Sequence, residues 1–139
     1  MIREIVKDTE ILKTVSAKVK PNDKKTKQII DDLIDTATSL GDTCVGLAAI
    51  QINEPYKVIV VYNGSKYVPY INPIITEYRG NCYEAEEGCV SLEGTRIVKR
   101  YESVHIMHQK GNKFIKEKFR GFYAQIIQHE VDHLSGKLI

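Results

Sequence analysis

Apolar residues recur at helical spacing between Lys24 and Leu40, and this pattern predicts a long helix in the N-terminal half of the chain. The apolar positions are Ile29, Ile30, Leu33, Ile34, Ala37 and Leu40. Side chains at this spacing share one face of an α-helix and can pack against a core. Pro21-Asn22-Asp23 supplies a loop and an N-cap before the helix, and Gly41 is suited to end it. The stretch carries no candidate site residue, so we interpret the helix as part of the core.

The middle of the chain has the pattern of β-strands. Val58–Tyr62 is a run rich in β-branched residues, and Asn63-Gly64 is a strong hairpin signal before a second strand at residues 67–70. Residues 71–75 predict another strand, with Pro73 at an edge or a bulge because proline cannot donate to a sheet ladder. These strands should therefore pair as neighbours in an antiparallel sheet.

The C-terminal half predicts a second hairpin and a last helix. Residues 97–109 and 113–119 read as two strands that turn at Lys110-Gly111-Asn112. Gly121–Leu134 follows as a helix, and Gly136 comes after its end. One face of this helix collects Phe122, Ile126, His129, Glu130 and His133.

The order of these elements indicates the fold class. Residues 1–20 read as an arm with a turn of helix, followed by the long helix, many short strands and the last helix. Because strands and helices do not alternate, the pattern predicts an α+β fold with mostly antiparallel β-sheets packed around the C-terminal helix. The 139 residues show no repeat or linker, so we expect one domain over residues 1–139.

Composition and charge limit the kinds of partner that the sequence supports. The formal net charge of +2 and the absence of a basic stripe with interleaved aromatics argue against nucleic acid as a specific partner. No apolar stretch reaches the ~18–20 residues needed to cross a bilayer. The charged N-terminus does not resemble a secretory signal, so we expect a cytoplasmic protein without membrane attachment, whose three cysteines are reduced.

The most informative motif is His-Glu-Val-Asp-His at residues 129–133. On a helix, His129 and His133 lie about one turn apart on the same face, which lets two neutral ring nitrogens reach one metal ion. Glu130 can then stand beside a metal-bound water without ligating the metal. The alternative is a pair of solvated histidines on a surface helix.

A metal site of this kind needs a third protein ligand. Only residues 134–139 follow His133, and none of them can ligate, so the ligand is expected upstream. The upstream candidates are Cys44, Cys82, Cys89, His105, His108, Glu84, Glu86 and Glu87. Cys89 stands out in Glu87-Gly88-Cys89-Val90-Ser91 because a thiolate is a strong ligand for zinc or ferrous iron, although it could equally be a small buried apolar residue. His105 and His108 should point to opposite faces of a strand, which makes a structural or exposed role the better interpretation.

A second stretch, residues 45–51, combines small and apolar residues with a terminal Gln51. Small residues allow backbones and substrates to approach closely. A buried carboxamide needs hydrogen-bond partners. Gln51 therefore either bonds the backbone structurally or donates to a substrate oxygen, and the sequence leaves both interpretations open.

Three segments together closely resemble the motifs of peptide deformylases. They are Gly46-Leu47-Ala48-Ala49-Ile50-Gln51, Glu87-Gly88-Cys89-Val90-Ser91 and Gln128-His129-Glu130-Val131-Asp132-His133-Leu134, and they occur in the order of that family. Ile71-Asn72-Pro73 also resembles a strand of the family, and Arg96 and Arg100 lie where its members carry arginines. The resemblance covers nearly the whole chain and implies the peptide deformylase fold.

The resemblance also implies an activity, which is removal of the formyl group from the N-terminal formyl-methionine of new bacterial polypeptides. It implies one divalent metal ion, physiologically Fe²⁺ with Zn²⁺, Ni²⁺ or Co²⁺ as alternatives, held by Cys89, His129 and His133. Glu130 would be the general acid–base. The carboxamide of Gln51 and the backbone N–H of Val90 would stabilise the oxyanion.

For the substrate, the resemblance implies a backbone contact at Gly46 and a methionine pocket that includes Val45, Phe122 and Ile126. The sequence departs from the usual motifs at Cys44, Ile50, Glu93 and Gln125. The departures at Cys44, Ile50 and Glu93 support one alternative, a deformylase-like metal- or peptide-binding protein without catalysis. A small metallopeptidase that cleaves ordinary peptide bonds is a second alternative, which the lack of a ligand after His133 disfavours. The C-terminal extension that some members use to dock on the ribosome is not seen after the last helix, so the resemblance supports at most a transient ribosome contact.

Overall fold

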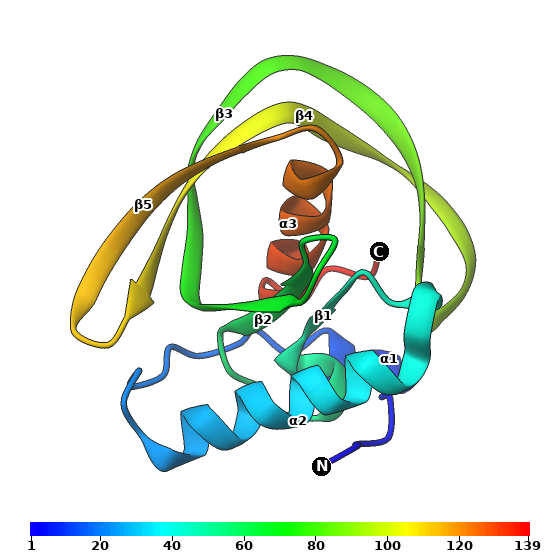
Figure 1. The fold of residues 1–139 in the computed structure, drawn as a ribbon. Coiled ribbons are helices and arrows are strands. Elements are labelled where there is room, and N and C mark those ends of the chain that lie inside the picture. Colours follow the sequence, from blue (N-terminus) through cyan, green and yellow to red (C-terminus); the bar gives the residue numbers. More distant parts are fainter.

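The computed structural model describes residues 1–139 and shows an α+β fold with one antiparallel sheet, as the sequence predicts (Figure 1). The elements in chain order are α1 (Thr9–Leu12), α2 (Lys24–Leu40), β1 (Gly46–Ala48), β2 (Val58–Tyr62), β3 (Tyr67–Cys89), β4 (Leu92–Lys110), β5 (Lys113–Arg120) and α3 (Gly121–Leu134). Short 3₁₀ turns at Gly41–Thr43 and Ala49–Ile52 flank β1. The predicted bounds of α2, β2 and α3 are confirmed.

The sheet follows the order β1-β2-β3-β4-β5, and every neighbouring pair is antiparallel. The long strands β3 and β4 form an arch, and α3 lies beneath it (Figure 1). Because the arch ends at Cys89, the last residue of β3 reaches the same region as the second half of α3.

The prediction of separate strands at residues 67–70 and 71–75 is wrong, because both belong to the single long strand β3. Pro73 lies in a register irregularity between Ile71 and Ile74, which agrees with the predicted bulge. Residues 76–88 were not predicted as strand because most of their side chains are exposed and polar, so no apolar alternation marks them. Backbone pairing with β4 defines them instead.

Both predicted hairpins are present. The loop between β2 and β3 is longer than a two-residue turn, and the side-chain oxygen of Asn63 accepts from the backbone N–H groups of Ser65 and Lys66 at 2.9 Å each. Strands β4 and β5 turn between Lys110 and Lys113, as expected.

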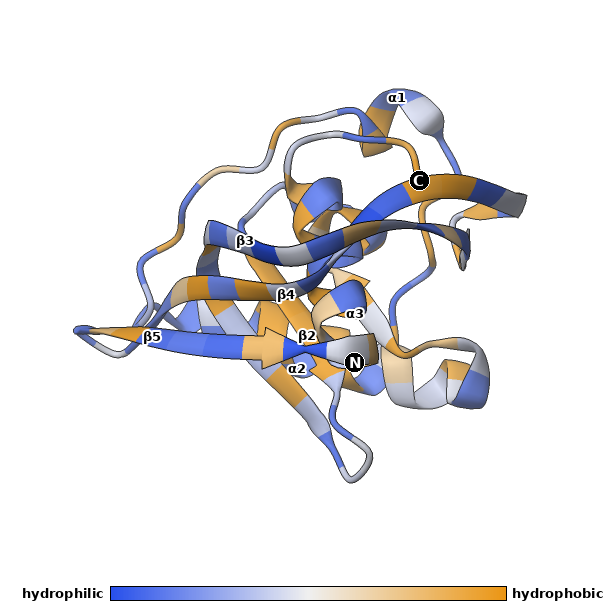
Figure 2. Cartoon of the chain, turned by 90° about the horizontal axis from the view of Figure 1, so that it is seen from above, coloured by the Kyte–Doolittle hydropathy of each residue, from blue (hydrophilic) through white to orange (hydrophobic).

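The core consists of two apolar clusters on opposite sides of β1 and β2. Ile59 and Val61 belong to the cluster around α3, whereas Val58 and Val60 belong to the cluster under α2. This division follows from the period of two along a strand, which sends successive side chains to opposite faces. Figure 2 shows the contrast between the apolar β2 and the largely polar β5. Strand β1 is thereby held against α3, which carries the histidines.

The helices follow local rules at their ends. Helix α2 begins after Asp23, whose extended backbone suits an N-cap, and Gly41 follows its last residue with a φ of 62°, a left-handed value that favours glycine. In length and apolar character, every helix falls short of what a membrane crossing requires.

Candidate metal centre

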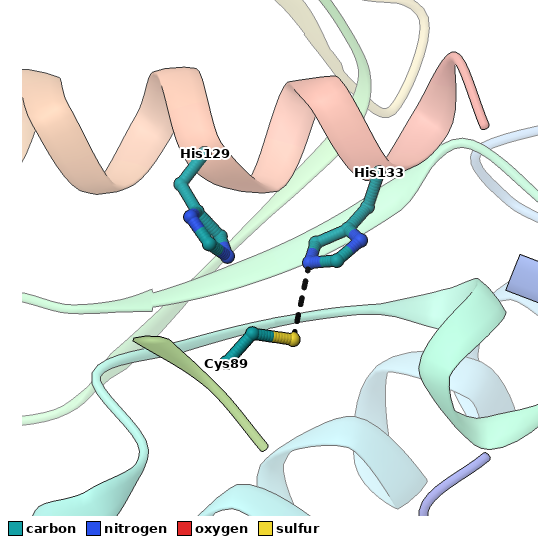
Figure 3. Close-up of side chains that lie close together, drawn as sticks. All are labelled: Cys89, His129 and His133. Carbon is teal, nitrogen blue, oxygen red and sulfur yellow. Dashed lines mark hydrogen bonds between the residues drawn. The ribbon is translucent and has the colours of Figure 1, made fainter. Parts of the chain in front are cut away.

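Helix α3 presents His129 and His133 from successive turns, and Cys89 at the end of β3 faces both rings (Figure 3). The ligand atoms of the three side chains all lie within 4.8 Å of one another. Cys89 Sγ lies 3.7 Å from His133 Nε2. A tetrahedral ion with metal–sulfur and metal–nitrogen bonds of about 2.3 and 2.0–2.1 Å would separate such atoms by roughly 3.6 Å. The three residues therefore fit one divalent metal ion.

The reversal of the chain after β3 holds Cys89 in place. Residues Val90 and Ser91 connect β3 to β4, and the backbone N–H of Ser91 donates to Cys89 Sγ at 3.3 Å. The turn thus positions the sulfur of Cys89 beside the histidines.

Glu87 supports the histidine side of the centre. Its Oε1 accepts from His129 Nδ1 at 2.8 Å, and Arg100 donates to both of its oxygens at 2.7 and 2.9 Å. Burial would raise the pKa of Glu87, but the bonds from His129 and Arg100 outweigh it and lower the pKa to about 2. Since an ionised carboxylate can only accept, the Nδ1 of His129 carries a proton and its Nε2 is left to face Cys89 and the metal position.

The sequence alone does not indicate this role for Glu87, which is there only one member of an acidic group of candidate ligands. Glu87 lies two residues before Cys89 and so points to the same face of β3, but this alternation becomes a signal only once the segment is known to be a strand. Arg100 reaches Glu87 from β4 and also binds Asp132 of α3 at 2.7 Å. These contacts join β3 and β4 to α3.

The two histidines have opposite protonation tendencies. Burial lowers the pKa of His133 to about 3, and the positive charges of His129, Arg100 and Arg96 act in the same direction. Burial would also lower the pKa of His129, but its bonds to Cys89 and Glu87 outweigh burial and raise the pKa to about 10. His133 is therefore neutral and ready to ligate, whereas His129 must lose a proton first.

Glu130 lies beside the centre with its carboxylate almost fully enclosed. The side chain is 4% exposed, and Oε1 has no hydrogen-bond partner in the protein. Burial raises the pKa of Glu130 to about 7. A carboxyl group with such a pKa can both take and return a proton near neutral pH.

Gly46 of β1 makes room for Glu130. A Cβ at this position would lie 2.8 Å from Glu130 Oε2 and 2.9 Å from Ile126 Cγ2, distances that real side chains do not tolerate. The requirement for glycine is therefore one of space, since β1 passes directly over the helix.

Gln51 makes the bond to the backbone that the first of its two interpretations expects. Its Oε1 accepts from the backbone N–H of Ala48 at 3.0 Å, which fixes the carboxamide. Its Nε2 donates to Ser91 Oγ at 3.1 Å and lies 3.5 Å from Cys89 Sγ. The amide nitrogen therefore borders the metal position.

A cavity of about 210 Å³ opens beside these groups. Val45 and Phe122, 39% and 63% exposed, lie at its mouth, and the buried Ile126 forms part of its wall. Of the predicted site residues, the cavity is lined by Val45, Gly46, Gln51, Cys89, Val90, Phe122, Ile126, His129 and Glu130. His133 is not in the lining and is almost completely buried behind it.

The other candidate ligands are not part of the group formed by Cys89 and the two histidines of α3. Cys82 is exposed on β3, and His105 and His108 pair with Glu77 and Glu117 at 3.0 and 2.6 Å. Neither of these strand histidines belongs to the group of residues that could hold a metal ion. The buried thiol of Cys44 bonds Gly46 O at 3.2 Å, and burial raises its pKa to about 12.

Two of the departures from the family motifs are remote from the ligands. Ile50 is 1% exposed in the core around α3, and Glu93 is exposed on β4. Neither side chain lines the cavity.

Comparison with known proteins agrees with this geometry. Residues 2–139 match the family model described as Polypeptide deformylase. A peptide deformylase of Clostridium beijerinckii is 45% identical over 141 residues, which cover 100% of both chains.

Solved structures show the same fold. The crystal structure of peptide deformylase from Thermotoga maritima has a TM-score of 0.90 and 30% identity, covering 99% of this chain and 95% of that one. A Met-Ala-Ser bound class I type b peptide deformylase from Acinetobacter baumannii has a TM-score of 0.88 and 30% identity, covering 99% of this chain and 96% of that one. The metal centre, the fold and these full-length similarities together place this chain in the peptide deformylase family.

Proposed function

We propose that this chain is a metal-dependent hydrolase that removes the formyl group from the N-terminal formyl-methionine of new polypeptides. The observation that carries the proposal is the group of Cys89, His129 and His133 beside the enclosed carboxylate of Glu130. Membership of the peptide deformylase family supports it, as does the relative from Acinetobacter baumannii that binds Met-Ala-Ser.

The metal would be held by Cys89 Sγ and one nitrogen of each histidine. When bound, it supplies an acidified water at neutral pH and polarises the formyl oxygen. The Cys-His-His donor set suits iron, zinc, nickel or cobalt. We propose Fe²⁺ as the native ion, one per chain.

Glu130 would move the proton in this reaction. With a pKa near 7, its carboxylate takes the proton of the attacking water and later delivers it to the leaving amine. Its enclosure under Gly46 keeps bulk water away, so the proton is passed to the substrate and is not lost to solvent.

Attack on the formyl carbon places negative charge on the formyl oxygen. The Gln51 carboxamide, already oriented by Ala48 and Ser91, and the backbone N–H of Val90 would donate to it. A donor held in advance needs no reorganisation during the reaction, and losing one typically costs about 100–1000-fold in rate.

The substrate would enter through the cavity mouth. The methionine side chain would pack on Val45, Phe122 and Ile126, and the peptide backbone would run along Gly46. A substrate of this class is made in the cytoplasm, so we propose a cytoplasmic enzyme acting as one domain, with at most transient contact with the ribosome.

The test measures formate released from formyl-Met-Ala-Ser by protein loaded with Fe²⁺ without air, or with Ni²⁺. The control is Glu130→Gln, which keeps the size of the side chain and removes the proton acceptor. Metal content is determined in the same samples. Formate release equal to that of the Glu130→Gln control would overturn the proposal, and formyl-peptide binding without turnover would instead favour a binding protein.

A further inference from the structure

Glu87 is bonded at every position at which it can accept. Its two oxygens receive His129 Nδ1, two nitrogens of Arg100, and Gln125 Nε2, the last at 3.0 Å from Oε2. An ionised carboxylate offers about four acceptor positions, and these four donors fill them. The orientation of Glu87, and through it the ring of His129, therefore depends on all three partners.

Gln125 is the third of these partners. It lies on α3, four residues before His129, and its carboxamide is bonded at both ends. Nε2 donates to Glu87, and Oε1 accepts from the hydroxyl of Tyr83 on β3 at 3.0 Å.

The direction of this chain of bonds is determined by chemistry. Glu87 can only accept, so the amide nitrogen of Gln125 must face it. The amide oxygen then faces Tyr83, whose hydroxyl must donate. Burial and the charge of Glu87 raise the pKa of Tyr83, so the hydroxyl keeps its proton.

We propose that Tyr83 and Gln125 are positioning residues that brace Glu87 and so hold His129 in its metal-ligating orientation. The brace joins the arch of β3 to α3, and Gln125 and Glu87 both line the cavity. It rests on the proposed function only in that His129 ligates a metal. Groups behind a ligand commonly change metal affinity by about 10–100-fold.

A bond between strand and helix could also serve stability alone, and two features of Gln125 argue for the positioning role. Its amide nitrogen donates to Oε2 of Glu87, and the other oxygen of Glu87, Oε1, accepts from His129 Nδ1. In addition, Glu87 is only 7% exposed, so loss of the Gln125 donor leaves an acceptor position that water reaches poorly. Glu87 would then turn to recover a bond, and His129 would turn with it.

The experiment measures release of Ni²⁺ from the loaded full-length chain into excess EDTA. Gln125→Leu should release the metal about tenfold faster than the unmodified chain, and Tyr83→Phe about threefold faster. Gln125→Glu keeps size but cannot donate to an ionised Glu87, so its release should be at least as fast as that of Gln125→Leu. The double variant should be no faster than Gln125→Leu, since Tyr83 acts through Gln125.

Tyr123→Phe is the matched control. Tyr123 also lies on α3 and is half-buried, but its hydroxyl bonds Tyr70 at 2.6 Å and has no part in the Glu87 network. Its release rate should stay within twofold of the unmodified chain even if its melting temperature falls. The Co²⁺-loaded protein provides a second readout, because its visible absorption should shift in Gln125→Leu and not in Tyr123→Phe.

The outcomes separate the two proposals. If the unmodified chain retains Ni²⁺ and releases formate while Gln125→Leu loses metal at the unmodified rate, the brace is refuted and the proposed function stands. If Tyr123→Phe accelerates release as much as Tyr83→Phe, the effect is general stability and the brace is again refuted. If the unmodified chain retains no metal, the proposed function itself fails.

Discussion

Gly46→Ala should separate the position of Glu130 from the binding of the metal. The added Cβ would lie 2.8 Å from Glu130 Oε2, 2.9 Å from Ile126 Cγ2 and 3.0 Å from Glu130 Cγ. Ordinary contact begins at 3.4 Å, so Glu130 or β1 must shift by about 0.6 Å, the difference between 3.4 and 2.8 Å. Glu130 is the softer element, because its Oε1 has no partner to hold it.

The size of the effect follows from this displacement. A misplacement of 1 Å at a reacting group can cost about 100-fold in rate, so kcat/KM should fall on the order of 10–100-fold. This range corresponds to about 1.4–2.7 kcal/mol of transition-state stabilisation. Overpacking should also lower the free energy of unfolding by about 1–3 kcal/mol. The ligands Cys89, His129 and His133 are not touched, so metal content should not change.

Formate release at saturating metal, metal content and urea unfolding are the assays. Gly88→Ala is the matched control, because a Cβ there would meet Gly94 O at 3.7 Å and Thr95 Cγ2 at 3.8 Å, both ordinary contacts. Activity of Gly46→Ala within threefold of the Gly88→Ala control would refute the steric argument. Loss of activity together with loss of metal would show that the change acts on the ligands and not on Glu130.

Three other outcomes are expected. Metal loading at pH 8 should release about one proton from His129, because its bonds to Cys89 and Glu87 outweigh burial and raise its pKa to about 10. Metal affinity should therefore rise with pH below that value. Calorimetry in two buffers measures the released proton, and no proton uptake by the buffer would contradict the prediction. Burial would raise the pKa of Asp32, but bonds from the Met1 amine, Gln28 and Arg3 outweigh burial and lower it. The contribution of the Asp32 carboxylate to stability is therefore complete above the unfolded pKa of about 3.9 and is lost as pH falls below it. Urea unfolding should find Asp32→Asn less stable than the unmodified chain at pH 7, with a difference that shrinks in acid. Iron-loaded protein should lose activity in air faster than nickel-loaded protein, since ferrous iron and its thiolate ligand oxidise, and equal decay would count against iron as the working metal.

The elements with a regular local pattern could be predicted from the sequence. Helices α2 and α3 and strand β2 have the expected bounds because helical spacing and β-branched runs are properties of neighbouring residues. The second half of β3 could not be predicted, because its polar side chains face solvent and only its backbone pairing with β4 makes it a strand. That segment is also the one that carries Glu87 and Cys89 to the helix.

The candidate site divides in the same way. The spacing of His129 and His133 is a property of one helix, and the thiol of Cys89 made it a candidate metal ligand from its residue type. The acid–base role of Glu130 and the oxyanion role of Gln51 were implied by the resemblance to one family. The hydrogen bonds from Glu87 to His129 and Arg100 could not be predicted from the sequence. Glu87 and His129 are 42 residues apart and meet only because the arch of β3 and β4 packs over α3.

The sequence by itself therefore determined the secondary structure with a strong period, the chemical types of the site residues and their resemblance to one enzyme family. Only the tertiary structure decided which nitrogen of His129 faces the metal position, why position 46 needs glycine and how Glu130 comes to have a pKa near 7. The physical reason is that helical spacing acts over a few residues, whereas desolvation, close contact and hydrogen-bond direction depend on elements that packing brings together.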